Sequence, residues 1–185
     1  MQQGCDGFEF DVWLSADGQA VICHDEAIGG MKIEQTDSKS LSLPTLQDVL
    51  QQFAERAFLD IELKVTGLEA LILAELREHP PQKGYVVSSF LPDVLAAIRD
   101  LDPAIPLGFL CETPDQLRGW RETPAQWVIP RFDLADQELV ERVHTADKKI
   151  MVWTVNRAER MREFAEWGAD AIISDETELL VRSLR

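Results

Sequence analysis

Two carboxylates alternate with apolar residues near the start of the chain. Glu9 and Asp11 lie within the run Phe8–Val12, and this alternation predicts a strand. Since alternate side chains of a strand share a face, the two carboxylates point the same way, about 7 Å apart. Two like charges on an otherwise apolar strand are costly to bury, and a cation between them offsets the cost. Hard oxygen ligands favour Mg²⁺ or Ca²⁺, so this segment predicts a divalent-cation site.

A histidine follows on the next predicted strand. After a turn at Ser15–Gly18, the apolar run from Val21 ends at His24, thirteen residues beyond Asp11. Imidazole titrates near neutrality and can move a proton to a leaving alkoxide. An isolated histidine is more often structural than catalytic. Carboxylates and a histidine in one short segment are nevertheless typical of phosphoester chemistry.

A third carboxylate lies on a second alternating strand. In the segment Asp60–Lys64, Glu62 alternates with Asp60 and Lys64 in the same way as Glu9 does with Asp11. One interpretation is a plain ion pair between Glu62 and Lys64. The other is that Glu62 joins Glu9 and Asp11 around the cation.

Strands and helices alternate strictly over the rest of the chain. Several strands are near-continuous apolar runs, as expected for a parallel sheet covered on both faces. The pattern predicts strands over 58–64, 85–90, 106–111, 127–132, 150–156 and 171–174, and helices over 68–78, 92–101, 136–144 and 158–167, with others starting near 44, 113 and 176. Residues 27–42 are predicted to form a loop, with Pro44 as the first helical residue.

Seven main strands, with the extra strand that ends in His24, fit two architectures. One is a TIM-type (β/α)₈ barrel, in which functional groups lie at the carboxyl ends of the strands. The other is an open doubly wound sheet, but the sequence has no glycine-rich phosphate loop to support it. In a barrel, Phe90, Arg131 and Trp153 would lie at or near strand ends. Arg131 could supply positive charge there or form an ion pair at the rim.

Composition limits the partners. At 185 residues the chain is long enough for one domain, 1–185, with a large core. Its net charge of −15 disfavours nucleic acid and anionic membranes as partners. Three cysteines without paired spacing indicate a reducing compartment, and we expect a cytoplasmic protein. No stretch approaches the roughly 18 apolar residues of a membrane span.

Six motifs resemble the glycerophosphodiester phosphodiesterases and occur in the order of that family. They run from about Gly4 to the C-terminus: Glu9-Phe10-Asp11 with His24-Asp25-Glu26, Leu43-Pro44-Thr45-Leu46, Asp60-Ile61-Glu62-Leu63-Lys64, Ser88-Ser89-Phe90, Val152-Trp153-Thr154-Val155-Asn156, and Gly168-Ala169-Asp170 with Ile173-Ser174-Asp175. The resemblance implies a TIM-type (β/α)₈ barrel with about seven of its eight strands present.

The resemblance also implies an activity and a site. The reaction would be metal-dependent hydrolysis of a small glycerophosphodiester to sn-glycerol 3-phosphate and an alcohol. Glu9, Asp11 and Glu62 would hold Mg²⁺ or Ca²⁺, and His24 would be catalytic. The substrate and its phosphate would be bound by Lys64, Trp153 and Phe90. The alternatives are an impaired barrel that still binds metal and phosphodiester, and an unrelated metal-dependent barrel enzyme such as an aldolase or isomerase.

The chain departs from the family at its N-terminus. Family members begin with a strand ending in His-Arg and a helix, whereas Met1–Gly4 resembles only the last turn of that helix. We therefore expect an N-terminally incomplete domain whose unpaired strand edges make it aggregation-prone or dimeric rather than monomeric. We also expect this chain to have little phosphodiesterase activity until an upstream segment is restored.

Overall fold

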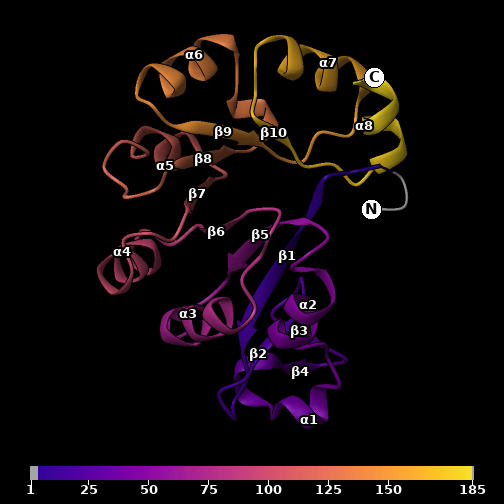
Figure 1. Ribbon diagram of the computed structural model, residues 1–185, viewed down its shortest axis with the longest axis vertical. Coiled ribbons are helices and arrows are strands. Elements are labelled where there is room, and N and C mark those ends of the chain that lie inside the picture. Colours follow the sequence, from indigo (N-terminus) through magenta and orange to yellow (C-terminus); the bar gives the residue numbers. More distant parts are fainter. Residues whose placement is uncertain (1–3, 185) are drawn as a thin grey trace. The chain divides into compact units, whose positions relative to one another are not determined.

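The computed structural model describes residues 4–184 in two compact units, one of residues 7–105 and one of residues 4–6 with 106–184 (Figure 1). The helical turn expected at the very start of the chain falls mainly on residues 1–3, which lie outside the described part. Gly4 itself has a φ of 93°, the left-handed conformation expected of a helix-capping glycine.

The unit of residues 7–105 is built on a four-stranded sheet in the order β6-β5-β1-β2. The parallel strands β1 (Gly7–Leu14), β5 (Phe58–Leu63) and β6 (Tyr85–Ser89) alternate with the helices α2 (Leu46–Phe53), α3 (Glu69–Glu78) and α4 (Pro92–Leu101). The short strand β2 (Ala20–Ile22) pairs antiparallel with the end of β1. This unit therefore contains every predicted site residue except Trp153.

Close contact between β1 and β5 requires a glycine. A Cβ on Gly7 would lie 2.0 Å from the carbonyl oxygen of Phe58 on the neighbouring strand, so no larger residue fits there. The resulting register pairs Glu9 with Asp60 and Asp11 with Glu62.

The start of α2 differs from the prediction by two residues. Thr45, not Pro44, caps the helix, and the first helical residue is Leu46. The Thr45 hydroxyl accepts a hydrogen bond from the Asp48 amide at 3.1 Å, and the Asp48 carboxylate accepts one from the Thr45 amide at 2.8 Å. This capping box holds the chain in an extended conformation until after Thr45 and so delays the helix.

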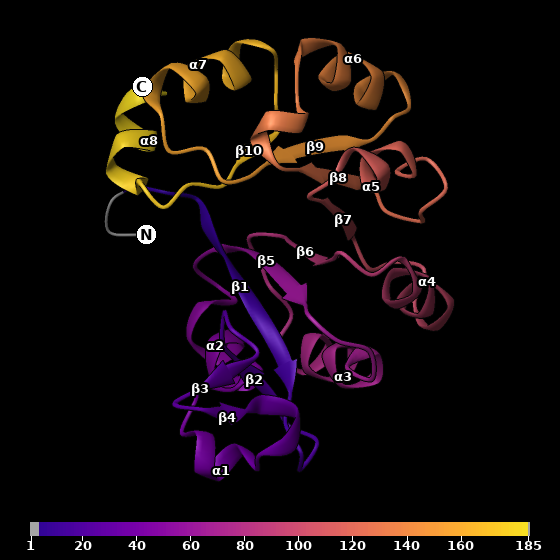
Figure 2. The same ribbon diagram turned by 180° about the vertical axis from the view of Figure 1, so that it is seen from behind.

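The prediction of a loop over residues 27–42 is wrong. This segment forms a small hairpin of β3 (Ala27–Ile28) and β4 (Met31–Lys32), a 3₁₀ turn η1 (Ile33–Gln35) and a short helix α1 (Ser38–Leu41). These elements lie at the carboxyl end of β1 (Figure 2). Ile33 and Leu41 bury their side chains against Val21, which gives this segment a core that its polar composition conceals.

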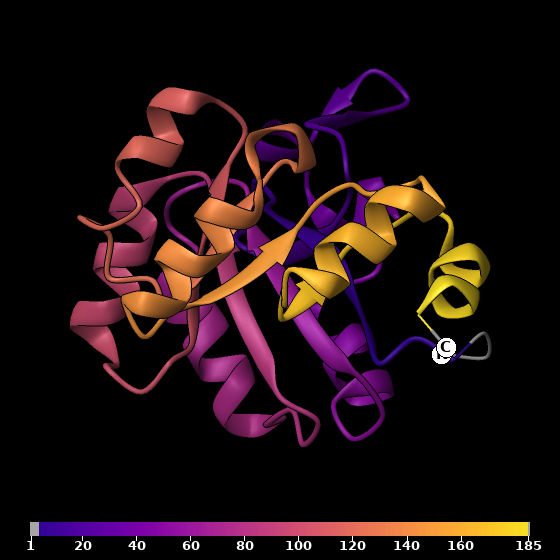
Figure 3. The same cartoon turned by 90° about the horizontal axis from the view of Figure 1, so that it is seen from above.

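In the unit that contains residues 106–184, four parallel strands follow one another in the order β10-β9-β8-β7. Its strands are β7 (Leu107–Cys111), β8 (Trp127–Pro130), β9 (Lys149–Val152) and β10 (Ala171–Ile172), and its helices are α5 (Pro114–Arg118), α6 (Gln137–Thr145), α7 (Ala158–Glu166) and α8 (Thr177–Ser183), with a 3₁₀ turn η2 (Phe132–Leu134). Helices α6 and α7 cover one side of β9 (Figures 1 and 3).

Within residues 4–184 the structure has the seven parallel strands and the extra antiparallel strand, β2, that the sequence predicted, and in addition the unpredicted β3–β4 hairpin. Strand β2 ends at Ile22, two residues before His24. The apolar positions of β5, β6, β7 and β8 are almost entirely buried, which explains why these strands read as continuous apolar runs. In the described part of the chain, every helix is too short or too polar to cross a membrane.

Candidate metal and phosphodiester site

The three predicted carboxylates meet at one place. Strand alternation puts Glu9 and Asp11 on one face of β1, and the parallel register brings Glu62 of β5 beside Asp11. One carboxylate oxygen from each residue lies within 4.8 Å of the other two. This arrangement is the one expected of a three-carboxylate cation site, and the role of these residues as metal ligands remains a prediction.

Burial makes the negative charge in this cluster costly. Burial raises the pKa of Glu9 from its ordinary value of 4.5 to about 9, and the negative charges of Asp11, Asp60 and Glu62 add to this effect. Burial also raises the pKa of Glu62, against the opposing hydrogen bond and charge of Lys64. In the described part of the chain, the buried Oε1 of Glu9 accepts no hydrogen bond. A divalent cation would supply both the missing charge and the missing partner.

Asp60 is a fourth carboxylate on this face, and no role for it was predicted from the sequence. It is fully buried, and its Oδ1 accepts a hydrogen bond from the Ser88 hydroxyl at 2.6 Å. Burial raises the pKa of Asp60 to about 7, while the Ser88 hydrogen bond lowers it. The same alternation that selects Glu62 also places Asp60 on this face, so the signal was present in the sequence.

Lys64 lies among the carboxylates. Its Nζ is 2.6 Å from Glu62 Oε1 and 3.1 Å from Asp11 Oδ1, and the side chain is 22% exposed. Burial lowers the pKa of Lys64, but its hydrogen bonds to Glu62 and Asp11 and their charges outweigh burial, so the net shift is upward. The ammonium also lies 5.9 Å from the ring centroid of Phe90. The sequence left two interpretations of Glu62 open, an ion pair with Lys64 or a place in the candidate cation site. The structure is compatible with both, because Glu62 pairs with Lys64 and also lies beside Glu9 and Asp11.

His24 follows β2, at a point where the backbone lies beside Asp11 of β1. The amide of Cys23, the preceding residue, donates to the carbonyl of Asp11 at 3.2 Å. The His24 side chain is 86% exposed, and its Nδ1 lies 2.9 Å from Asp25 Oδ1. Among the described residues, the ring pairs with Asp25 rather than with Glu9, Asp11 or Glu62. An exposed imidazole held by a neighbouring carboxylate is available to a bound substrate.

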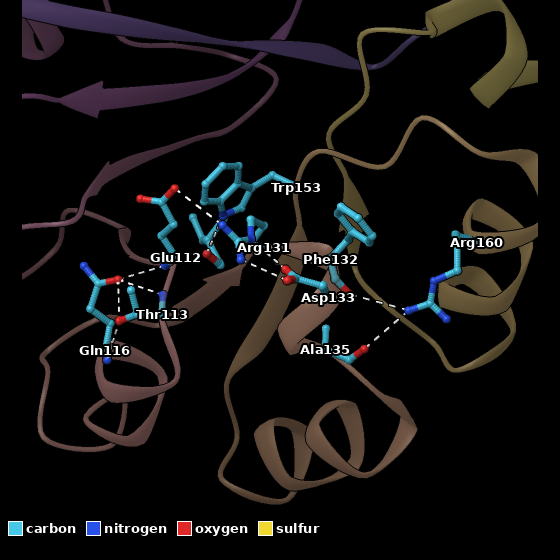
Figure 4. A network of polar contacts seen from close by, with 10 residues as sticks. Glu112, Thr113, Gln116, Arg131, Phe132, Asp133, Ala135, Trp153 and Arg160 are labelled. Atoms are coloured by element: carbon cyan, nitrogen blue, oxygen red, sulfur yellow. Dashed lines mark hydrogen bonds and ion pairs between the residues drawn. The ribbon is translucent and has the colours of Figure 1, made fainter.

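Trp153 and Arg131 belong to the unit of residues 106–184 and lie on its strand ends (Figure 4). The Trp153 indole donates to the carbonyl of Ile129 at 2.9 Å, so packing within the sheet fixes the ring. Arg131 makes two hydrogen bonds to Asp133, at 2.6 and 2.9 Å, and an ion pair to Glu112 at 3.5 Å. With two acidic partners Arg131 offers little net positive charge, which favours the rim ion pair over an anion site.

The raised carboxyl pKa values predict how stability depends on pH in metal-free protein. Glu9 and Asp60 hold protons in the folded state, to about pH 9 and about pH 7, that the unfolded chain releases near pH 4. Stability falls with rising pH wherever the folded state binds more protons. We therefore expect the free energy of unfolding, measured by urea titration in EDTA, to fall between pH 5 and pH 9, by up to about 1.4 kcal/mol per pH unit for each group.

Saturating Mg²⁺ or Ca²⁺ is the control, because a bound cation replaces the protons and should flatten this dependence. A metal-free protein that becomes more stable from pH 5 to pH 9 would contradict the prediction.

Comparison with known proteins gives a consistent result. The model of the glycerophosphoryl diester phosphodiesterase family matches residues 1–83 and 31–179. A glycerophosphodiester phosphodiesterase of Caldanaerobacter subterraneus is 28% identical over all of this chain and 88% of its own length. One from Bacillus altitudinis is 25% identical over 95% of this chain and 84% of its own length.

Solved structures agree with these sequence matches. A phosphodiesterase of Oleispira antarctica, in complex with the product sn-glycerol-3-phosphate, has 25% identity and a TM-score of 0.87 over 99% of this chain and 86% of its own. A glycerophosphodiester phosphodiesterase of Thermotoga maritima has 23% identity and a TM-score of 0.85 over 100% of this chain and 87% of its own. These similarities confirm the predicted TIM-type (β/α)₈ barrel class. With the family match covering nearly the whole sequence, the chain belongs to the glycerophosphoryl diester phosphodiesterase family.

Proposed function

We propose that this protein hydrolyses small glycerophosphodiesters to sn-glycerol 3-phosphate and an alcohol, with the help of a divalent cation. The observation that carries the proposal is the convergence of Glu9, Asp11 and Glu62 beside Lys64, in a chain of this family. The product complex of the Oleispira antarctica phosphodiesterase supports the same reaction class. Family membership argues against the aldolase or isomerase alternative.

The residues of the site suit the cation that the family implies. Glu9, Asp11 and Glu62 would hold it, and their hard oxygen donors favour Mg²⁺ or Ca²⁺ over softer metals. When bound, the cation supplies Lewis-acid polarisation of the phosphate and lowers the pKa of a hydroxyl or water.

The remaining residues bind the substrate and move a proton. Lys64 would neutralise a non-bridging phosphate oxygen, since its ammonium is a compact charge on a flexible stem. His24 would give a proton to the leaving alkoxide through its exposed ring, with Asp25 orienting Nδ1. Phe90, whose ring lies 5.9 Å from the Lys64 ammonium, would provide apolar surface for the carbon atoms of glycerol, and the same role for Trp153 stays a prediction.

We further propose that the substrate is a free small molecule and that the protein works in the cytoplasm. Cys5, Cys23 and Cys111 are all unpaired, which suits a reducing compartment. The net charge of −15 disfavours nucleic acid as a partner.

A product assay tests the reaction. The purified chain, alone and extended upstream by a segment with a His-Arg strand, would be incubated with glycerophosphocholine or glycerophosphoethanolamine, and sn-glycerol 3-phosphate would be measured with its NAD-dependent dehydrogenase. We expect little product from the chain alone, and product formation by the extended chain that stops in EDTA and returns with Mg²⁺ or Ca²⁺. Turnover that persists in EDTA, or release of phosphocholine and glycerol instead, would contradict the proposal. Cation binding by the extended chain without any turnover would favour the impaired barrel.

A further inference from the structure

We infer that the Lys64 ammonium competes with the divalent cation for Asp11 and Glu62, so that binding of the cation frees Lys64 for the phosphate. The inference rests on the proposed function, because it takes these carboxylates as the cation ligands. It goes beyond the proposed function because it predicts that the binding of the cation and the binding of the substrate phosphate strengthen one another.

Lys64 and the cation need the same two carboxylates. Lys64 Nζ lies 2.6 Å from Glu62 Oε1 and 3.1 Å from Asp11 Oδ1. The Asp11 and Glu62 side chains are only 10% and 9% exposed, so they have little room to turn toward a second partner. Both belong to the three residues whose carboxylate oxygens converge within 4.8 Å.

The two positive charges exclude one another. Oxygen ligands lie about 2.0–2.6 Å from Mg²⁺ or Ca²⁺. A cation at that distance from Asp11 and Glu62 would occupy the space beside the ammonium, and the like charges would repel strongly in a site with little water. At least one of the two lysine contacts must therefore lengthen when the cation binds.

Only the side chain of Lys64 needs to move. Its backbone is fixed, because the Lys64 amide donates to the carbonyl of Val12 at 3.1 Å. Its four-carbon stem is flexible, and the ring of Phe90 already lies 5.9 Å from the ammonium. Movement along this apolar surface would keep the ammonium at the site with its donors free for a phosphate oxygen.

Thermodynamic coupling follows from this exchange. If the cation releases Lys64 from the carboxylates, a phosphate ligand no longer has to break those ion pairs. The cation then raises the affinity for phosphate, and by reciprocity phosphate raises the affinity for the cation.

The test measures cation affinity without any phosphodiester. Isothermal titration with Mg²⁺ and Ca²⁺ would compare the wild type with Lys64→Met and with Lys83→Met, a matched control at an exposed lysine of the same unit. A like charge at this range changes an equilibrium constant about tenfold, the equivalent of about one pKa unit. We therefore expect Lys64→Met to bind the cation about tenfold more tightly than the wild type. The affinity of Lys83→Met should change by less than about twofold. Equal affinities for the two variants, or weaker binding by Lys64→Met, would overturn the inference.

A second measurement on the wild type holds even where Lys64→Met fails to fold. In protein labelled with ¹⁵N-lysine, the Nζ resonance of Lys64 should shift on adding saturating Mg²⁺, while that of Lys83 should not. A Lys64 resonance that is unchanged in the cation-bound protein would show that the ammonium stays where it is and would overturn the inference.

These outcomes separate the inference from the proposed function. A wild-type chain that binds no cation defeats both. A chain that binds the cation with no response at Lys64 defeats only the inference. A chain in which Lys64 responds, but which hydrolyses no glycerophosphodiester even with the upstream segment restored, supports the inference and defeats the proposed function.

Discussion

Replacing Glu62 by glutamine, in a chain with its upstream segment restored, should lower turnover of a glycerophosphodiester by about 10²–10⁴-fold and weaken cation binding in parallel. Glu62 is a nearly buried member of the converging carboxylates, and an amide cannot replace its charge. Because the loss acts through the cation, raising Mg²⁺ or Ca²⁺ to millimolar concentrations should restore part of the activity. Turnover measured across a cation titration, with affinity from calorimetry, would show both effects.

Glu55→Gln is the matched control for this variant. Glu55 is exposed, belongs to the same unit and undergoes the same chemical change, so its turnover and cation affinity should equal those of the wild type. A Glu62→Gln protein with an unaltered cation titration would remove Glu62 from the ligand set.

In a chain restored with its upstream segment, replacing His24 by alanine should lower turnover by about 10²–10⁴-fold while cation affinity and melting temperature stay nearly unchanged. The ring is 86% exposed and its described partner Asp25 is also exposed, so little folding energy is at stake. Loss of the imidazole should therefore lower the rate of the chemical step and leave folding and cation binding unchanged. Turnover, calorimetry with Mg²⁺ and a thermal melt on one preparation would separate these effects.

His144→Ala supplies the comparison for loss of an imidazole. The His144 ring pairs with Asp170 at 3.0 Å, and Asp170 also accepts a hydrogen bond from the amide of Ile150, so this histidine is structural. We expect His144→Ala to keep its turnover and to lose some thermal stability. Near wild-type turnover of glycerophosphocholine by His24→Ala would show that another group moves the proton.

The sequence alone determined which residues share a face and how the elements alternate. The period of two in Phe8–Val12 and Asp60–Lys64 is a local property of the backbone, so it places Glu9 with Asp11, and Asp60 with Glu62, in any strand. Continuous apolar runs likewise identified the buried parallel strands. Helix starts were less reliable, because the capping box at Thr45 outweighed the preference of Pro44 for the first helical position.

Only the tertiary structure decided how these faces meet. The pairing of Asp11 with Glu62 depends on the register of β1 against β5, which the close approach of Gly7 to Phe58 permits. The position of Lys64 between two carboxylates and the burial of Asp60 both follow from that register. Register is set by packing between strands about fifty residues apart in the chain, whereas the periodicity visible in a sequence reports only the conformation of neighbouring residues.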